Sequence, residues 1–136
     1  MRRTLTLRLQ TPAGEEQQDS LIALRLETPD GARGVLPGHE SALVLLAPGV
    51  GRYRVEDASE PRYFAAEAGL AWIGPEEVRL VSRWIARAPS LAALVRLVER
   101  RREVRGRLEE SARRQVERHE VATRRALAKL QREVSW

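Results

Sequence analysis

Hydrophobic and polar residues alternate with a period of two along the first two thirds of the chain. In residues 5–9 every second residue is leucine, and Ile22, Leu24 and Leu26 share one face of the run 21–26. Because successive side chains of a strand point to opposite faces of a sheet, each run predicts a half-buried strand. Short strands separated by turn-forming residues are typical of a β-sandwich or a flattened barrel. Similar runs lie at 50–55, 62–66, 70–73 and 78–84.

The apolar residues of the last third follow a helical spacing instead. Ser90 follows Pro89, and its hydroxyl can accept a hydrogen bond from a free amide of a helix that begins near Leu91. Two arrangements fit the pattern: one helix of about 45 residues, or a two-helix hairpin joined near Gly106. We favour the hairpin, because glycine inside a helix costs about 1 kcal/mol and the apolar stripe lapses over residues 99–107.

Composition and charge change at the same place. Residues 1–87 hold six of the seven prolines and eight of the nine glycines, with 11 Lys and Arg against 12 Asp and Glu. Residues 88–136 hold 13 Lys and Arg against 7 Asp and Glu, so all the excess positive charge lies there. The sequence therefore predicts a β-sandwich domain over 1–87 and a helical domain over 88–136.

Candidate catalytic chemistry is sparse. The sequence has no phosphate-binding glycine loop, dinucleotide fingerprint, zinc-protease helix or nucleophile elbow, and it has no cysteine and two histidines. It also has no apolar stretch long enough for a signal peptide or a membrane span. We expect a protein that is not an enzyme by itself and that needs no cofactor or metal.

The segment from Gly31 to Gly49 is the most specific motif. It reads Gly-Ala-Arg-Gly-Val-Leu-Pro-Gly-His-Glu-Ser-Ala-Leu-Val-Leu-Leu-Ala-Pro-Gly, in which the glycines and proline favour turns and the run 43–46 is expected to be buried. The segment resembles the epsilon subunit of the F-type ATP synthase, whose pattern is G-x-x-G-x-L-P-G-H-x-x-x-L-x-x-L-x-P-G. Residues 7–12, 64–73 and 78–82 resemble further strands of that family.

The resemblance implies a sandwich of about ten strands followed by a helical C-terminal domain. It further implies a non-catalytic central-stalk subunit that joins the gamma subunit to the ring of c subunits and couples ion translocation to ATP synthesis. Such a subunit is peripheral, on the cytoplasmic face of the bacterial inner membrane. By the same resemblance, candidate contact residues with these partners are Val35, Leu36, Pro37, Gly38 and His39, and nearer the ring Ala32 and Arg33.

The sequence departs from the family pattern at three places. Ala32 stands where an acidic residue is frequent, and Ala68 replaces the first glycine of a Gly-Gly pair. These departures favour the alternative N-type branch of the family. The nucleotide-binding members have an Asp and an Arg early in the first C-terminal helix, and the matching residues 90–95 have neither charge, so we expect no ATP sensing.

An arginine cluster marks the predicted helical domain. Two interpretations apply: a solvated surface with pairs such as Glu103–Arg107, Glu109–Arg113 and Glu110–Arg114, or an inhibitory tail that meets acidic C-terminal segments of the catalytic beta subunits when it is extended. The cluster comprises Arg100, Arg101, Arg102, Arg105, Arg107, Arg113 and Arg114.

Two other functional classes fit the composition. One is a free-standing β-sandwich adaptor whose helical tail dimerises. The other is a basic protein that binds nucleic acid or an anionic membrane surface. Seven acidic residues interrupt the basic helical domain, so we expect no nucleic-acid partner.

Overall fold

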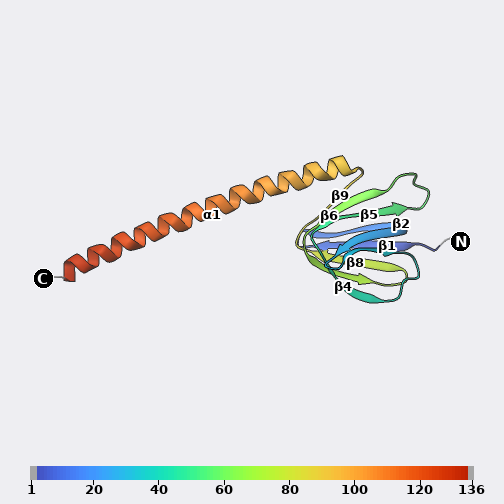
Figure 1. Cartoon of the computed structure of the whole chain (residues 1–136), viewed down its shortest axis with the longest axis horizontal. Coiled ribbons are helices and arrows are strands. Elements are labelled where there is room, and N and C mark those ends of the chain that lie inside the picture. The colour runs from blue at the N-terminus through green and yellow to red at the C-terminus, as the bar shows by residue number, and fades with distance from the viewer. Residues whose placement is uncertain (1–2, 135–136) are drawn as a thin grey trace. The chain divides into compact units, whose positions relative to one another are not determined.

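In a computed structural model, which describes residues 3–134, the chain forms nine β-strands and one α-helix (Figure 1). The predicted β-sandwich class is confirmed, with nine strands among the described residues where the resemblance implied about ten. The strands are β1 (Leu5–Thr11), β2 (Gly14–Thr28), β3 (Gly31–Val35), β4 (Ala42–Leu46), β5 (Gly49–Val55), β6 (Arg62–Ala66), β7 (Gly69–Ile73), β8 (Glu77–Ser82) and β9 (Ile85–Ala88), and the helix is α1 (Leu91–Val134).

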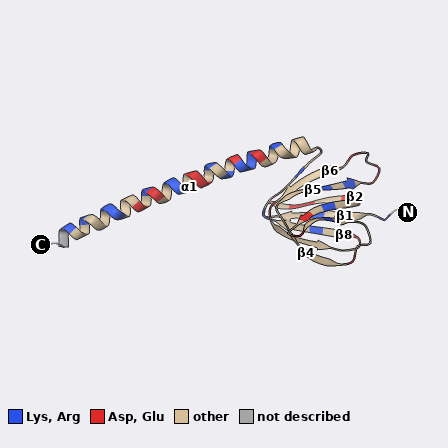
Figure 2. Ribbon diagram, in the orientation of Figure 1, with Lys and Arg blue, Asp and Glu red and all other residues tan. Residues whose placement is uncertain are grey.

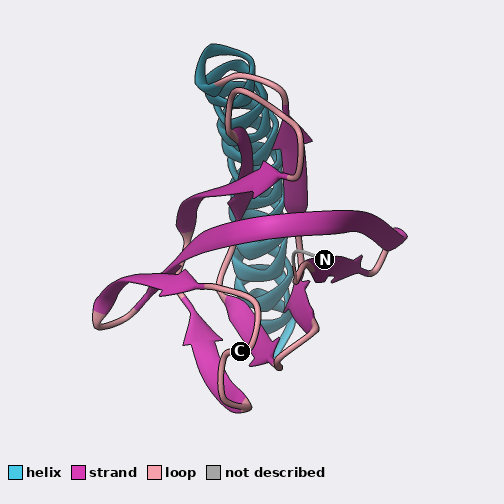
Figure 3. Cartoon of the chain, turned by 90° about the vertical axis from the view of Figure 1, so that its right-hand side faces the viewer, coloured by secondary structure: helices cyan, strands magenta, loops and turns pink. Residues whose placement is uncertain are grey.

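The strands follow one hydrogen-bonded path in the order β4-β7-β8-β1-β2-β5-β6-β9, with β3 paired to β2. Every pair is antiparallel except β1 with β8. The long strand β2 pairs with β1 through its first half and with β3 and β5 through its second half. It thus belongs to both layers of the sandwich, whose twisted strands and short loops are visible in Figure 3.

A β-bulge marks the place where β2 passes between layers. The register shifts between Leu21 and Ala23, and Ser20 just before it has a positive φ of 64°. A bulge adds one residue to the strand, so the alternation of faces changes there. The predicted face of Ile22, Leu24 and Leu26 is therefore corrected: Leu21, Leu24 and Leu26 are buried, and Ile22 is half-buried.

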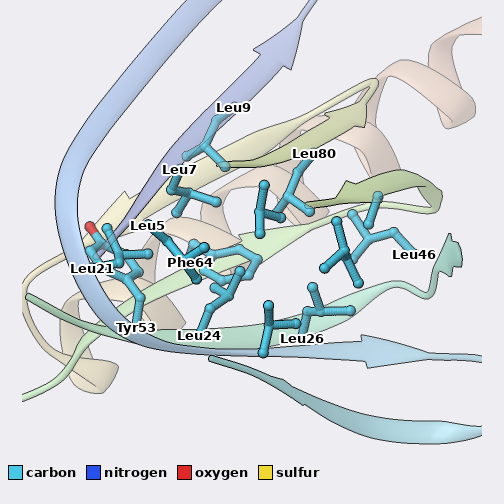
Figure 4. Packing of buried hydrophobic residues seen from close by; sticks show 14 of the residues in the cluster. Leu5, Leu7, Leu9, Leu21, Leu24, Leu26, Leu46, Tyr53, Phe64 and Leu80 are labelled. Atoms are coloured by element: carbon cyan, nitrogen blue, oxygen red, sulfur yellow. The ribbon is translucent and has the colours of Figure 1, made fainter. Parts of the chain in front are cut away.

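The core lies between the layers, and six leucines of β1 and β2 form its largest group (Figure 4). Phe64 on β6 and Tyr53 on β5 belong to this core, with ring centroids 6.5 Å apart. Because the core is continuous across both layers, the first 98 residues form one compact unit, Met1–Val98, and the second unit is Glu99–Trp136. This division lies 11 residues after the change in composition at residue 87.

Gly69 begins β7 where the backbones of β7 and β8 approach closely. A Cβ added to Gly69 lies 1.9 Å from the carbonyl oxygen of Val81, whereas one added to Gly34 has no atom within 4 Å. We expect Gly69→Ala to lower the free energy of unfolding by about 1–3 kcal/mol, because the two strands must move apart. Urea unfolding of the two Gly→Ala variants checks this, and an equal effect of both substitutions contradicts it.

The first two turns of α1 pack on the sandwich through a second, smaller apolar cluster. Leu94 is 0% exposed and lies with Ala65 on β6 and Ala88 on β9. The Ser90 hydroxyl accepts a hydrogen bond from the amide of Ala93 at 3.2 Å. The predicted cap and the predicted start at Leu91 are therefore confirmed.

The favoured two-helix hairpin is wrong, because α1 is a single helix of 44 residues that continues through Gly106. A single glycine costs about 1 kcal/mol, which a long helix of good helix-forming residues tolerates when no proline or turn sequence follows. The surrounding Arg and Glu residues also form pairs one turn apart, Glu103–Arg107 at 3.7 Å and Glu110–Arg114 at 2.8 Å. Residues Ser135 and Trp136 of the predicted helical domain lie outside the described residues.

Candidate interaction surfaces

The strand β4 exposes two large apolar side chains. Leu43 is 57% exposed and Leu45 60%, whereas Leu46 is buried and Val44 packs against the core. The expectation that the whole run 43–46 is buried is therefore wrong. A strand in which every residue is apolar still turns half of its side chains away from the core, so its outer face is apolar too.

The neighbouring strand β7 extends this apolar face. Leu43 pairs with Trp72 and Leu45 with Leu70, and Trp72 is 47% exposed. We call Leu43, Leu45, Leu70 and Trp72 the β4–β7 apolar surface. It lies on the terminal strand of the hydrogen-bonded path, which is a typical place for a partner to bind, since an exposed apolar edge is otherwise prone to aggregate.

Charged residues border the β4–β7 apolar surface on β8 and β1. The Arg8 guanidinium lies 2.5 Å from a carboxylate oxygen of Glu77 and 3.2 Å from one of Glu15, and Arg79 lies 3.9 Å from Glu77. The side-chain hydrogen bond of Glu15 and the charge of Glu77 raise the pKa of Arg8, which stays protonated. An open pocket of about 650 Å³ lies between the β4–β7 apolar surface and these charged residues. Its lining includes Leu43, Trp72, Glu77 and Arg79. An apolar centre with a charged border is the usual composition of a protein interface.

A tight turn leads directly into β4. Gly38 has a φ of 85°, and its amide donates a hydrogen bond to the carbonyl of Pro75 at 2.8 Å. The amide of His39 donates to the carbonyl of Leu36 at 3.2 Å, and the His39 Nδ1 lies 2.6 Å from the carbonyl oxygen of Glu40. These bonds hold the turn against the β7–β8 connection, next to the β4–β7 apolar surface.

The seven predicted contact residues fall in this turn and in β3. Leu36 is 62% exposed, and Pro37, Gly38 and His39 are exposed or half-exposed. On β3, Ala32 is exposed and Arg33 half-exposed. Val35 is the exception, because its side chain is fully buried in the core.

Sequence reasoning missed the residues of the β4–β7 apolar surface. A signal for Trp72 was present, since it alternates with the buried residues Ala71 and Ile73. For Leu43 and Leu45 no such signal exists, because the run 43–46 is apolar on both faces.

The basic residues of the helical cluster lie around the whole circumference of α1. Figure 2 shows Lys and Arg mixed with Asp and Glu along its length. Arg100, Arg107 and Arg114 repeat every seven residues and therefore share one side of the helix. The other four members, Arg101, Arg102, Arg105 and Arg113, point in other directions at 3.6 residues per turn.

The described residues present neither a metal site nor a membrane-spanning helix. Within 3–134, no group of three or more His, Asp and Glu side chains is arranged to hold a metal ion. No helix in this part of the chain is long and apolar enough to span a membrane.

Comparison with known proteins identifies the sandwich. The profile of the family "ATP synthase, Delta/Epsilon chain, beta-sandwich domain" matches residues 4–88. The chain belongs to this family. The resemblance drawn from the Gly31–Gly49 segment is thereby confirmed.

Relatives of this family cover most of the chain. An ATP synthase epsilon chain 2 from Paraburkholderia xenovorans is 35% identical over 71% of this chain and 70% of its own length. Another from Cereibacter sphaeroides is 32% identical over 90% of this chain and 75% of its own length.

Solved structures of low identity share the fold. A chain of the Euglena gracilis mitochondrial ATP synthase is 21% identical with a TM-score of 0.57, covering 76% of this chain and 66% of its own. A chain of the Tetrahymena thermophila mitochondrial ATP synthase central stalk and c-ring is 16% identical with a TM-score of 0.50, covering 62% and 67%. At these identities the likeness concerns the fold alone.

Proposed function

We propose that this chain is the non-catalytic epsilon subunit in the central stalk of a rotary F-type ATP synthase, where its sandwich joins the gamma subunit to the ring of c subunits. The observation that carries the proposal is the β4–β7 apolar surface, exposed on a sandwich of the ATP synthase delta/epsilon family. The subunit is peripheral, on the cytoplasmic face of the bacterial inner membrane, and it couples ion translocation to ATP synthesis without performing chemistry itself.

In this proposal the gamma subunit binds to the β4–β7 apolar surface and to the adjacent turn. Removing exposed Leu and Trp side chains from water drives association, and Trp is a frequent hot-spot residue. The charged border of Arg8, Glu77 and Arg79 then fixes the orientation of the partner. His39 takes part through the turn that its amide closes.

In the same proposal the c-ring binds to strand β3. Ala32 and Arg33 lie on a strand that pairs only with β2 among the described strands. Ala32 stands where an acidic residue is frequent, and Arg33 follows it. An arginine here favours an acidic or carbonyl-rich loop of the ring, and the departure agrees with assignment to the N-type branch.

Coexpression of the full chain with gamma tests the proposal. We expect a stable complex of this chain with gamma, and with gamma and the c-ring together, that survives size-exclusion chromatography. A chain that remains uncomplexed, although it is folded by circular dichroism, contradicts the proposed function.

A regulatory role of α1 forms the second part of the proposal. Arg100, Arg107 and Arg114 lie along one side of the helix, where Arg107 and Arg114 also pair with Glu103 and Glu110 of the same helix. An acidic C-terminal segment of the catalytic beta subunits complements these three arginines when α1 lies beside them. Such contacts between exposed charges are screened over about 8–10 Å at physiological salt.

We expect deletion of residues 99–136 to raise the rate of ATP hydrolysis by the assembled complex several-fold at low salt. High salt raises the intact complex toward the same rate, because it weakens the attraction of the arginines to the beta subunits. Replacing Arg100, Arg107 and Arg114 by Gln reproduces the deletion, whereas Gln at Arg102, Arg113 and Arg124, on the other side of the helix, is the control with equal loss of charge. Equal rates of all forms at every ionic strength contradict the regulatory role.

A further inference from the structure

The second unit of the chain leaves an apolar stripe of α1 uncovered. Leu108 is 65% exposed, the highest value among the large hydrophobic side chains that the structure describes, and Val116 is also exposed. Together with Ala112 they occupy one side of the helix. Exposed apolar stripes on long helices are usually covered by another helix.

Four polar residues extend the stripe along the same side of the helix, two before Leu108 and two after Val116. Its seven positions lie within about a quarter of the helix circumference, and they are separated by steps of 4, 3, 4, 4, 3 and 4 residues. The sequence of steps reads the same in both directions from Ala112. The seven residues are Arg101, Arg105, Leu108, Ala112, Val116, His119 and Thr123.

This spacing follows from 3.6 residues per turn and holds for any stripe of this width, so it permits an antiparallel pair of identical helices, and the charges beside the stripe decide between partners. When two copies cross with Ala112 beside Ala112, Leu108 of each copy meets Val116 of the other. The next layers pair Arg105 with His119 and Arg101 with Thr123, where the long arginine stems cover the smaller side chains and the guanidinium groups reach water.

The charges on one flank of the stripe are complementary in the same arrangement. Arg102, Glu109, Arg113 and Glu120 follow the seam on one side, with alternating sign. Antiparallel packing places Arg102 against Glu120 and Glu109 against Arg113, and the two-fold axis produces each pair twice. Four ion pairs therefore form across the seam, and no like charges meet on this flank.

The other flank is uncharged over the same length. Val104 meets Ala122, and Ser111 meets Gln115. A helix of unrelated sequence has no reason to match the positions of these charges. The charged pairs are centred one residue before Ala112 and the uncharged pairs one residue after it, as the two flanks of one antiparallel seam require, and this selects a second copy of the chain as the occupant.

We propose that the free protein forms an antiparallel homodimer through residues 101–123 of α1, with Ala112 at the two-fold axis. The pairing uses neither the β4–β7 apolar surface nor the predicted contact turn. It stands independently of the proposed rotor function and describes the protein before it joins a complex.

Charge reversal in the full chain tests the dimer by sedimentation equilibrium. Arg102→Glu with Arg113→Glu makes the flank wholly acidic, and Glu109→Arg with Glu120→Arg makes it wholly basic. We expect each double variant alone to dimerise at least about tenfold more weakly than the natural chain, since four pairs become repulsive. An equimolar mixture of the two variants restores a one-to-one dimer. Arg118→Glu with Arg125→Glu, away from the stripe, is the matched control and dimerises like the natural chain.

Disulfide formation tests the orientation, because the natural chain has no cysteine. Leu108→Cys and Val116→Cys, mixed and oxidised, form a disulfide with each other and not with themselves. A natural chain that stays monomeric up to several hundred micromolar, a mixture that fails to restore the dimer, or self-coupling of Leu108→Cys overturns the proposal. Circular dichroism of every variant confirms that α1 remains helical. Capture of gamma by the charge-reversed variants separates a failure of this proposal from a failure of the proposed function.

Discussion

Leu43→Gln combined with Trp72→Ala is expected to weaken binding of the gamma subunit by about a hundredfold or more, since hot-spot truncations each cost about 2 kcal/mol or more. The two residues face each other across β4 and β7 and are largely exposed in the free chain. Their loss removes apolar contact area from the interface while leaving the core intact. Titration of labelled gamma with the natural and variant chains measures the change in Kd.

A substitution on a strand away from β4 and β7 is the control that separates the loss of gamma binding from a general loss of stability. Val50 on β5 is 41% exposed, and Val50→Gln removes a similar kind of side chain away from the β4–β7 apolar surface. We expect melting temperatures of both variants to stay near that of the natural chain, because surface substitutions usually change stability by about 0.5 kcal/mol or less. An equal loss of affinity in the control, or undiminished binding by the double variant, contradicts the assignment of this surface to gamma.

Leu94→Ala is expected to lower the free energy of unfolding by about 2–5 kcal/mol, as for other fully buried leucines. Leu94 is the one fully buried leucine of α1 among the described residues, and it packs against Ala65 and Ala88. The cavity left by Ala separates the first two turns of the helix from β6 and β9. Urea unfolding followed by circular dichroism measures the change.

The same substitution at Leu108 is the matched control. Leu108 lies on the same helix and is 65% exposed, so Leu108→Ala removes no buried contact within a single chain and keeps a strong helix-forming residue. Measured where the chain is monomeric, its effect is expected to be within about 0.5 kcal/mol of zero. Equal effects at both positions show that the first two turns of α1 are not anchored to the sandwich.

Alternation was sufficient to predict the strands with one polar and one apolar face. The run 5–9 became β1, because its leucines face a single core. The run 62–66 became β6, where Phe64 and Ala66 face that core and Ala65 on the other face packs under α1. The first half of β2 was missed because residues 15–19 are polar on both faces and pair with β1 at the surface. The strand β9 was missed because four residues, Ile85–Ala88, are too short for a periodic pattern.

The interaction surface was only partly visible in the sequence. The glycine and proline residues at 31–38 indicated a turn with a specific backbone shape, and Gly38 has the positive φ that this requires. Which side of the run 43–46 is covered depends on the neighbouring layer of the sandwich, which lies far away in the sequence. Similarly, the choice between a hairpin and one helix at Gly106 depended on a cost of only about 1 kcal/mol, too small to decide the path of the chain.

The continuous path of strands from β4 to β9 has a mechanical consequence under the proposed rotor function. One terminal strand is β4, which carries the exposed leucines. The other is β9, which precedes α1 and contacts its first turns. A force applied to β4 by a turning partner passes to β9 through backbone hydrogen bonds, and β2 carries it from one layer to the other. Load transfer then depends on backbone bonds rather than on side-chain packing between layers, so the sandwich responds to torque as a stiff element and not as two sheets that slide.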